Sequence, residues 1–594
     1  MKRFTEAIVS IIRGLSRAVS RFPLTVICLS CTAILLCYMI SLHKTPELMI
    51  QKLMFTFLLG AFLGIAAQFS CERFDRWSKM RLVVYGVSAV LTVGYYLILL
   101  PSPSISFEVE IRTFVAIFAM FCAFLWVPSF RGQANFNVIA LTHFKSIFTS
   151  VLYSGVLAAG MAAIIAAVDT LLFKVNSDTY GYMMTIVWVI FAPIYYLSLL
   201  PRFNSADESD RGDVQRSGEY PKFLEILVSY IAIPLLTAYT LVLTAYFIKI
   251  LVTFKWPSGQ LGVMVLAYAA AGLTIYVLAS QLENRFANWY RMIFPKVLIP
   301  VVIMQLVSVA IRLNAYGVTE SRYYVTLFGI FSLVCGITLS FKPVARNGII
   351  AVLAAGFAIL SVMPPVDAFT VSRVSQITRL EGMLSAEGIL VNGKISPKAD
   401  VSTKLRTETT NIVSYLENRN YIKYIKWLPA NFNSRDIQSA LGFEPAYAGS
   451  VNNFYANLDM QKPFDISGYD ICVNTFLNRS MGNTNQPSYD FEVRGVKYQL
   501  AFDRISEQEV RVLVKNSAGT ELVGTGLYDF TKKLSENGNM GKEGLLPEKM
   551  TFSVENNGYK LRIMLQNVNI TYGSESGVDY GLFIMFGAPA SANP

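Results

Sequence analysis

The stretch GIIAVLAAGFAILSVM at residues 348–363 decides the fold class, because it is the last of eleven apolar stretches that fill the first 363 residues. PPVDAFTVSRVSQITRLEG follows at residues 364–382, and the hydrophobicity stops there. A membrane-spanning helix needs about 20 mainly apolar residues. The sequence therefore predicts an α-helical polytopic membrane bundle of about eleven transmembrane helices. An α+β, mainly antiparallel β, soluble domain of about 230 residues follows the bundle.

Working back from residue 363, we place the spans at residues 24–42, 53–69, 82–100, 113–127, 147–168, 182–200, 226–248, 261–280, 297–311, 323–341 and 348–363. The fourth, ninth and eleventh are short for a bilayer crossing. The expected domains are a basic amphipathic helix (1–22), a six-span half (23–200), a cytoplasmic linker (201–222), a five-span half (223–365), a helical juxtamembrane segment (366–450) and a β-rich extracytoplasmic domain (451–594).

The charge distribution argues for membrane orientation and against nucleic-acid binding. The whole chain has a net charge of +11, with 51 basic and 40 acidic residues. Residues 366–594 hold 23 basic and 24 acidic residues, so the entire basic excess lies in the loops of the membrane part. Basic loops at a membrane surface fix topology, whereas a phosphate-binding face would be a folded basic patch. We therefore expect no nucleic-acid partner.

Basic residues alternate along the loops. Counting from the N-terminus, every second flanking segment is basic, and these segments hold 20 of the 28 basic residues before residue 366. By the positive-inside rule the N-terminus is cytoplasmic. Eleven crossings then place residues 366–594 outside, in a protein that we expect in a bacterial plasma (inner) membrane.

The first 22 residues carry an apolar face and a basic stripe. Arg13, Arg17 and Arg21 recur every four residues on a face away from the apolar positions. This pattern is typical of an amphipathic helix on the anionic lipids of the inner leaflet. A basic lead-in that only fixes topology is the alternative.

Cysteine and histidine usage limits the chemistry. Six of the seven cysteines lie in or beside spans, and Cys472 alone lies in the soluble domain, which therefore cannot form an internal disulfide. The only histidines are His43 and His143. We expect no metal, no cofactor and no catalytic residue. Cys28 and Cys31 form a CxxC inside the first span, where small apolar packing is favoured over redox chemistry.

Small residues and prolines mark the packing of the spans. Gly60 and Gly64 in the second span, and Ala159, Ala163 and Ala167 in the fifth, have the spacing that lets helices approach closely. Pro193, Pro234 and Pro300 interrupt the sixth, seventh and ninth spans, either as tolerated kinks or as broken helices at an ion path.

The densest polar segment is RLNAYGVTESRYY at residues 312–324, between the ninth and tenth spans on the predicted outer side. Such a cluster can hold an anionic headgroup or dock the C-terminal domain. An ordinary interfacial turn with an aromatic belt is the alternative. The candidate functional residues are Arg312, Asn314, Tyr316, Gly317, Thr319, Glu320, Arg322 and Tyr323.

The pattern R-x-x-x-YG-x-TE-x-RY, with FPKVLIP at residues 294–300, resembles a family of bacterial multi-pass membrane proteins of unknown function (DUF4153). NVIALTHFKSIFTSVLY (137–153), IYYLSLLP (194–201) and RLEGMLSAEGILVNGKI fit the same family, so the resemblance covers roughly residues 20–420. It implies a bacterial plasma-membrane protein and implies no reaction. The motif positions are Arg312, Tyr316, Gly317, Thr319, Glu320, Arg322 and Tyr323.

The C-terminal region changes from helical to strand periodicity near residue 451. Helices are expected at 368–387, 402–418 and 434–441, the last capped by Ser434 and closed by Gly442. Strands are expected at 464–476, 489–494, 496–502, 509–514, 521–527, 550–555, 559–568 and 580–586, with a helix at 529–536. These strands predict an antiparallel sandwich or an open barrel. GSESG (573–577) and Gly541-Lys542 match no nucleophile or phosphate motif.

Three functions remain from the sequence. The leading hypothesis is a non-enzymatic envelope protein for binding, anchoring or signalling, which carries an outer recognition domain for an envelope protein or a lipid headgroup. The second is a transporter or lipid translocase with Arg312 to Tyr323 at its outer mouth, which requires a cavity beside Pro234 and Pro300. The third is a membrane-embedded enzyme acting on lipid-linked substrates through Glu320.

Overall fold

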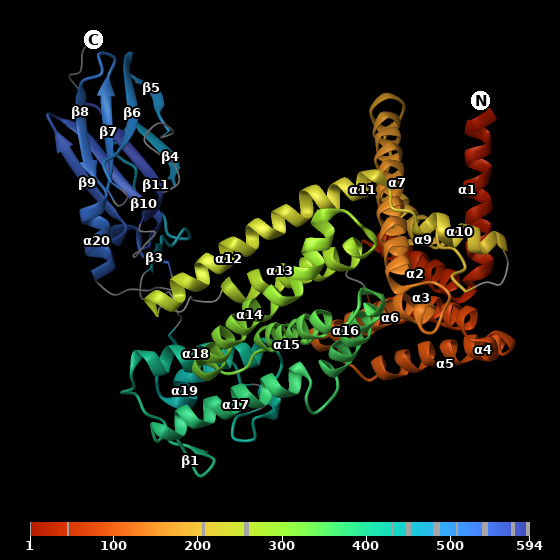
Figure 1. The fold of residues 1–594 in the computed structure, drawn as a ribbon. Helices are drawn as coiled ribbons and strands as arrows, with labels where there is room; N and C mark the ends of the chain where they lie inside the picture. The colour runs from red at the N-terminus through yellow and green to blue at the C-terminus, as the bar shows by residue number, and fades with distance from the viewer. Residues whose placement is uncertain are drawn as a thin grey trace. The chain divides into compact units, whose positions relative to one another are not determined.

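The chain forms two compact units, Met1–Gly382 and Met383–Pro594. The computed structural model describes residues 2–43, 47–204, 208–254, 260–429, 432–446, 453–478, 487–506, 509–536, 544–571 and 577–589. Unit 1 is helical, and unit 2 holds all the long strands (Figure 1). This confirms the predicted fold class, a polytopic helical part followed by a mainly antiparallel β part.

The first half of unit 1 contains the N-terminal helix and six predicted spans. Its helices are α1 (Lys2–Arg21), α2 (Pro23–Leu42), α3 (Leu48–Arg73), α4 (Asp75–Lys79), α5 (Arg81–Leu99), α6 (Phe107–Trp126), α7 (Phe136–Leu171), α8 (Asp178–Thr185) and α9 (Ala192–Ser198). A π-helical turn at Ile186–Phe191 joins α8 to α9, so these two helices form one span.

The second half of unit 1 contains the remaining spans. Its helices are α10 (Glu208–Gly218), α11 (Lys222–Ile226), α12 (Ile233–Thr253), α13 (Gln260–Leu278), α14 (Arg285–Tyr316), α15 (Glu320–Phe341), α16 (Gly348–Leu360) and α17 (Ala368–Ala386). Within the described residues, ten helical segments are long and apolar enough to cross a membrane, and they coincide with the first ten predicted spans. The eleventh is the shorter apolar helix Val344–Leu360.

This short helix packs along α6 in the opposite direction. At its start, Gly348 lies against Trp126, the last residue of α6. After its end, Asp367 lies 4.0 Å from Arg112, in the second turn of α6. The 20 residues of α6 are about 30 Å long, which matches a hydrocarbon core. The eleventh apolar helix, together with the residues that follow it up to Asp367, therefore connects the same two levels as a full-length candidate span.

Polar side chains mark one of these levels. Asn347 is fully buried, and its side chain donates to Asn137 Oδ1 (3.0 Å) and Ser280 Oγ (2.8 Å). Asn137 Nδ2 donates back to the carbonyl of Val344 at 3.2 Å. The first turn of α7, the end of the eighth span and the start of α16 are thus joined by buried hydrogen bonds, which are favourable where water is scarce.

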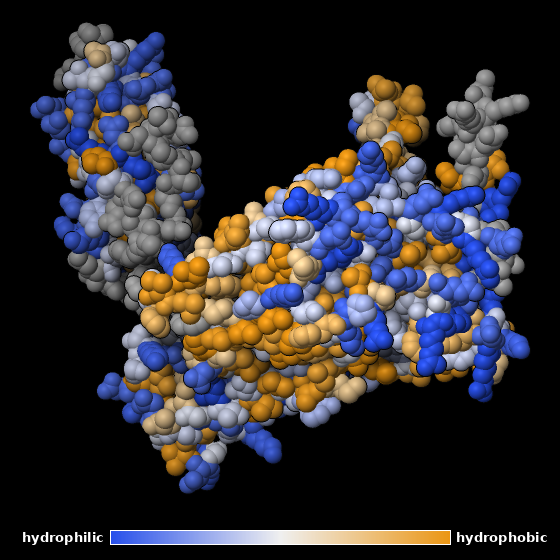
Figure 2. All heavy atoms as spheres, viewed as in Figure 1, coloured by the Kyte–Doolittle hydropathy of each residue, from blue (hydrophilic) through white to orange (hydrophobic). Residues whose placement is uncertain are grey.

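Apolar side chains cover the outside of unit 1. On α5, Leu82 is 89% exposed, Val90 70% and Ile98 72%. Figure 2 shows apolar side chains gathered over α12 to α15, and hydrophilic ones around α4 and α10. Apolar surface of this extent marks a membrane or protein interaction surface. On helices long enough to span a bilayer, it identifies unit 1 as a membrane domain.

The predicted glycine contacts are present, and the alanine face is not used. A side chain at Gly60 would lie 2.9 Å from Cys28 Sγ, and one at Gly64 would lie 2.6 Å from Thr25 Oγ1, so both glycines allow α2 and α3 to approach closely. By contrast, Ala159, Ala163 and Ala167 on α7 are exposed within the chain, so the prediction that they pack internally is wrong.

The prolines are accommodated within continuous spans. Pro193 and Pro234 each follow a π-helical turn, at Ile186–Phe191 and at Leu227–Ala232, which relieves the clash of the proline ring with the preceding turn. α14 continues through Pro300. Pro234 and Pro300 are both exposed on the outside of the unit. Their positions favour tolerated kinks over broken helices at an ion path.

Part of the predicted linker at 201–222 is helical. α10 (Glu208–Gly218) packs on α7, where Thr142 Oγ1 donates to the carbonyl of Ser217 at 3.3 Å and Lys145 Nζ donates to that of Glu219 at 2.7 Å. Val214 contacts the apolar core of the first half. The sequence did not predict this helix, because its residues show no apolar period. Its neighbours hold it mainly through its backbone carbonyls.

The helices of unit 2 follow the sequence prediction except at one cap. They are α18 (Thr403–Asn418), which Ser402 caps, and the short α19 (Ile437–Leu441) after a 3-10 turn at Ser434–Asp436. A capping box of Asn433 and Asp436 begins that turn, so the prediction of Ser434 as the cap is wrong by one residue. Gly442 closes α19 at φ 90°, as predicted. A two-stranded hairpin, β1 (Leu390–Val391) and β2 (Lys394–Ile395), precedes α18.

The strands form two antiparallel sheets. One contains β3 (Asn453–Asn457), β10 (Tyr559–Thr571), β11 (Gly577–Gly587) and β4 (Ile471–Leu477) in that order, with β9 (Thr551–Asn556) also paired to β10. The other contains β5 (Tyr489–Val493), β6 (Val496–Arg504), β7 (Val510–Asn516) and β8 (Glu521–Gly526) in order. α20 (Tyr528–Glu536) follows β8.

Buried residues from both sheets share one core, among them Val512 and Val514 of one sheet and Ile563, Leu582 and Ile584 of the other. The domain is therefore a sandwich and not an open barrel. Its predicted strands are confirmed with shifted ends, and β3 is an additional strand. The predicted strand at 464–476 begins only at Ile471. The segments Gly541-Lys542 and 573–576 lie outside the described residues.

Candidate functional site

The predicted polar cluster lies at the turn between α14 and α15. α14 ends at Tyr316, and Thr319 precedes the first residue of α15, Glu320. Gly317 has φ 69°, which favours glycine, and a side chain there would lie 2.8 Å from Gln376 Nε2. Both the backbone angle and the close neighbour explain why glycine occupies this position.

α17 holds this turn by hydrogen bonds to its backbone. Gln376 Nε2 donates to the carbonyl of Tyr316 at 3.0 Å and to that of Val318 at 2.9 Å. The amide of Val318 donates to Ser375 Oγ at 2.9 Å. Gln376 is only 3% exposed, so these bonds are shielded from water. We call this set of contacts between Ser375, Gln376 and the Tyr316–Val318 backbone the turn clamp.

Two arginines complete the clamp around Tyr316. Arg322 Nη1 donates to the carbonyls of Tyr316 (3.0 Å) and Gly317 (2.8 Å), and its guanidinium lies 5.5 Å from the centre of the Tyr316 ring. Arg379, on α17, donates to the Tyr316 carbonyl at 3.1 Å and lies 5.9 Å from the same ring. Carbonyls left without a partner at the end of α14 are thus satisfied by cationic donors, which also favour the negative end of the helix dipole.

The chain before α17 is fixed at the same place. Tyr323 donates its hydroxyl to the carbonyl of Val366 at 2.6 Å. Asp367 is fully buried and accepts from the amides of Phe369 (3.0 Å) and Thr370 (2.9 Å), so it caps α17. Arg112 lies 4.0 Å from this carboxylate. The entry of α17 is therefore tied to α15 and α6.

The remaining predicted residues, Arg312, Asn314 and Glu320, lie in three different environments. Arg312 does not join the clamp and lines a pocket between α13, α14 and α15. Asn314 is exposed, and no contact from its side chain brings it to the cluster. Glu320 is 3% exposed and does not line the pocket. Its position in the first turn of α15 suits the positive end of that helix.

The sequence did not reveal the α17 side of the clamp. Among the apolar residues of this helix, Leu380 and Leu384 are fully buried, whereas Val374 is 55% exposed. The buried face also carries Ser372 and Gln376, at four-residue spacing with Leu380. A polar residue on the buried face of an amphipathic helix is the signal that could have indicated a docking contact.

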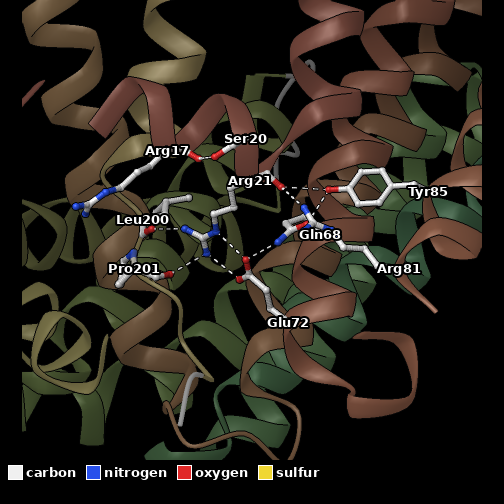
Figure 3. Close-up of polar contacts among 9 residues, drawn as sticks. All are labelled: Arg17, Ser20, Arg21, Gln68, Glu72, Arg81, Tyr85, Leu200 and Pro201. Atoms are coloured by element: carbon white, nitrogen blue, oxygen red, sulfur yellow. Dashed lines mark hydrogen bonds and ion pairs between the residues drawn. The ribbon is translucent and has the colours of Figure 1, made fainter. Parts of the chain in front are cut away.

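A second polar network lies at the opposite ends of the spans (Figure 3). Arg21 donates from Nε to Glu72 Oε1 at 2.7 Å and from Nη2 to Glu72 Oε2 at 2.8 Å, and it also donates to the carbonyls of Leu200 and Pro201. Gln68 donates to Glu72 Oε1 at 2.7 Å. The Arg21 and Glu72 side chains are only 10% and 14% exposed. This geometry is a forked ion pair that joins the end of α1 to the ends of α3 and α9.

Of the three arginines in the predicted basic stripe of α1, only Arg21 belongs to this network. Arg13 and Arg17 are exposed, and Arg17 points away from the network in Figure 3. Arg21 is held by protein groups, and its backbone carbonyl accepts from Arg81 (3.2 Å) and Tyr85 (3.3 Å). Arg21 therefore anchors α1 to the bundle, and two of the three stripe arginines remain available to a membrane surface.

One carboxyl group in unit 2 is unusual. Glu509 Oε1 is buried without a hydrogen-bond partner in the described part of the chain, and burial raises the pKa of this carboxyl above its ordinary value. The amides of Tyr528 and Leu527 oppose this effect and Asp529 adds to it. Within the described residues, no group of three or more His, Cys, Asp or Glu side chains is placed to hold a metal ion.

The fold and the buried contacts between spans define a multi-pass membrane protein with a C-terminal β-sandwich domain. Residues 30–395 match the family described as "Domain of unknown function (DUF4153)". The chain belongs to this family, and the turn clamp lies inside the matched region.

A relative of equally unassigned function is the "Uncharacterized protein PM1469" of Pasteurella multocida (strain Pm70), which is 22% identical over 224 residues. The match covers 36% of this chain and 37% of the relative, so the chain spans well under half of that protein's length. No solved structure matches the chain.

Proposed function

We propose that this chain is a non-enzymatic protein of the bacterial plasma membrane that holds its β-sandwich outside the cytoplasm as a recognition domain for an envelope component. The turn clamp carries the proposal. α17, which leads from the last apolar helix toward the sandwich, is bound to the α14–α15 turn through the Tyr316 and Val318 carbonyls. The chain that leads to the outer domain therefore leaves the bundle from a helix that is fixed to the α14–α15 turn.

The orientation rests on two independent supports. The first is the alternation of basic segments, which places the N-terminus in the cytoplasm. The second is the path of the chain from Gly348, which lies against Trp126 at the end of α6, to Asp367, which lies near Arg112 at the other end of α6. An eleventh crossing from a cytoplasmic start brings α17 and everything after it to the outside.

The proposal also places α1 at the cytoplasmic surface of the membrane. Arg13 and Arg17 are exposed, and Arg21 pins the C-terminal end of α1 to Glu72. Exposed arginines beside a span attract the anionic lipids of the inner leaflet. The two arginines thus add membrane contact at the cytoplasmic edge.

Cysteine labelling of intact cells tests the proposal. Cys472 is exposed and is first replaced by serine. Single cysteines are then introduced by Glu555→Cys on β9 and Asp213→Cys on α10, two exposed acidic positions. A membrane-impermeant maleimide should label the Glu555→Cys variant in intact cells and the Asp213→Cys variant only after lysis. Labelling of Glu555→Cys only after lysis would refute the proposal.

One observation favours lipid transport as a second candidate function. An apolar pocket of about 420 Å³ lies among α2, α3, α6, α7 and α9 in the first half, beside Trp188 and Pro193. This pocket is lined by other residues than the cavity expected beside Pro234 and Pro300. Its apolar lining suits an acyl chain. If the protein moves lipids, vesicles containing it will expose labelled inner-leaflet phospholipid to external dithionite faster than empty vesicles. Equal rates would remove this candidate.

A further inference from the structure

Three spans meet around a small pocket beside the turn clamp. Leu261 begins one candidate span, Arg312 lies in the last turns of α14, and Arg322 lies in the first turn of α15. The pocket therefore lies where spans end, at the depth of lipid headgroups. We call it the Arg312 pocket. It is lined by Leu261, Gly262, Val263, Ser308, Val309, Arg312, Ser321, Arg322 and Val325.

The lining has the chemistry of an anion site. Two arginines and two serines line a volume of about 200 Å³, and no acidic residue is among the lining residues. Guanidinium groups bind phosphate through paired, charge-assisted hydrogen bonds. The other lining residues are apolar or glycine, which suits the glycerol and first methylene groups of a lipid.

Two of the polar groups have no hydrogen-bond or ion-pair partner among the residues that the structure describes. Ser308 is only 6% exposed, and within the described part of the chain its hydroxyl makes no recorded hydrogen bond. The Arg312 guanidinium likewise has no recorded ion pair or hydrogen bond among the described residues, although α13 and α15 pack on either side. A hydroxyl on a buried residue and a half-buried cation that line the same pocket are both placed to donate to a ligand there.

We infer that the Arg312 pocket binds a phosphate ester group, with Arg312 and Ser308 as its principal donors and Arg322 at its rim. The volume is below the roughly 300–1,000 Å³ of pockets that enclose a whole drug-sized ligand. A headgroup phosphate fits, while acyl chains remain in the bilayer. This inference does not depend on which side of the membrane carries the sandwich.

Titration of the purified full-length chain in non-ionic detergent tests the inference. The two probes are short-chain phosphatidylglycerol and inorganic phosphate, and the measured quantities are the apparent dissociation constant and the ligand-induced rise in melting temperature. Arg312→Gln should weaken binding about tenfold or more, since it removes a charge-assisted contact. Ser308→Ala should weaken binding several-fold and leaves the charge unchanged. Arg346→Gln, at an exposed arginine at the other end of the spans, is the control for net charge.

The outcomes separate the ligand sources. Binding of phosphatidylglycerol alone, weakened by both pocket variants, supports a lipid headgroup. Binding of inorganic phosphate with the same variant dependence supports the same site with free phosphate as its ligand. Equal affinity in the wild type and both pocket variants, or an equal loss in Arg346→Gln, overturns the inference, as does failure of the wild type to bind either probe. If Arg312→Gln does not fold, Ser308→Ala decides the matter.

Discussion

Gln376 and Tyr316 are 60 residues apart in sequence, and the side-chain amide of Gln376 donates to the Tyr316 carbonyl at 3.0 Å. The same amide donates to Val318 at 2.9 Å, so one buried side chain satisfies the carbonyls on both sides of Gly317. A motif that the sequence suggested as a ligand site is thus largely occupied by a helix of its own chain. Arg312 does not join the clamp and, together with Ser321 and Arg322, lines a separate pocket.

Removal of the Gln376 amide should release α17. Gln376→Ala leaves two carbonyls without their donor, and each such hydrogen bond contributes about 0.5–1.5 kcal/mol. We expect hydrogen exchange in residues 368–382 to become about tenfold or more faster, as measured by mass spectrometry of the detergent-solubilised chain. Thr378→Ala, at an exposed position of the same helix, should leave exchange unchanged. Equal protection in both variants would show that the clamp does not hold α17.

Replacement of Gly317 should be more disruptive than replacement of another glycine. Gly317→Ala places a methyl group 2.8 Å from Gln376 Nε2 at φ 69°, and such strain costs about 1–3 kcal/mol. Gly356→Ala adds a methyl group to open space inside α16 and should be neutral or stabilising by up to about 1 kcal/mol. Melting temperatures of the two purified variants measure the difference. The prediction is wrong if Gly317→Ala melts at or above the wild-type temperature.

Loss of one partner of the Arg21–Glu72 pair should destabilise the first half of the bundle. Because both side chains are largely buried, removal of either leaves an uncompensated charge that costs about 3–5 kcal/mol. Arg21→Gln and Glu72→Gln should each lower the melting temperature, and the double variant should lose less than the sum of both.

The exposed Arg17 is the matched control for this pair. Arg17→Gln should change stability by less than about 0.5 kcal/mol. It should reduce the affinity of the N-terminal segment for vesicles that contain anionic phospholipid. Additive losses at Arg21 and Glu72 would contradict the ion pair as the source of the stabilisation.

Glu509 makes the stability of the sandwich depend on pH. Burial raises the pKa of this carboxyl in the folded state, so folding favours its protonated form. The associated stability is present below the ordinary glutamate pKa and is lost as pH rises through the raised value. We expect Glu509→Gln to raise the urea midpoint of unit 2 at pH 7.5 and to leave it nearly unchanged at pH 4.

Pulse proteolysis with a C-terminal epitope tag reads these midpoints. Glu555→Gln, at an exposed position on β9, should have no such effect at either pH. A Glu509→Gln variant that is less stable at pH 7.5 than the wild type would show that the ionised carboxylate contributes favourably.

Elements that depend on the local hydrophobic pattern were predicted from the sequence. Contacts between residues far apart in the sequence were not. The spans and the strands of the sandwich follow local periodicity, so their positions were predicted. β3 was not, because Asn453–Asn457 is short and its ladder to β10 links residues more than 100 positions apart. The burial of Arg21 was also not predictable, because a helical stripe does not reveal Glu72, 51 residues away, as a partner. The motif Tyr316 to Tyr323 was singled out by its polar residues, while its contacts with Ser375 and Gln376 required the path of α17.

Protease treatment of sealed, right-side-out membrane vesicles tests the central claim most directly, with different epitope tags at the two ends of the full-length chain. The account predicts that external protease removes the C-terminal tag and digests the sandwich while the N-terminal tag survives until detergent is added. A C-terminal tag that survives while an exterior control protein is digested would contradict an eleventh crossing by α16 and the outer location of the sandwich.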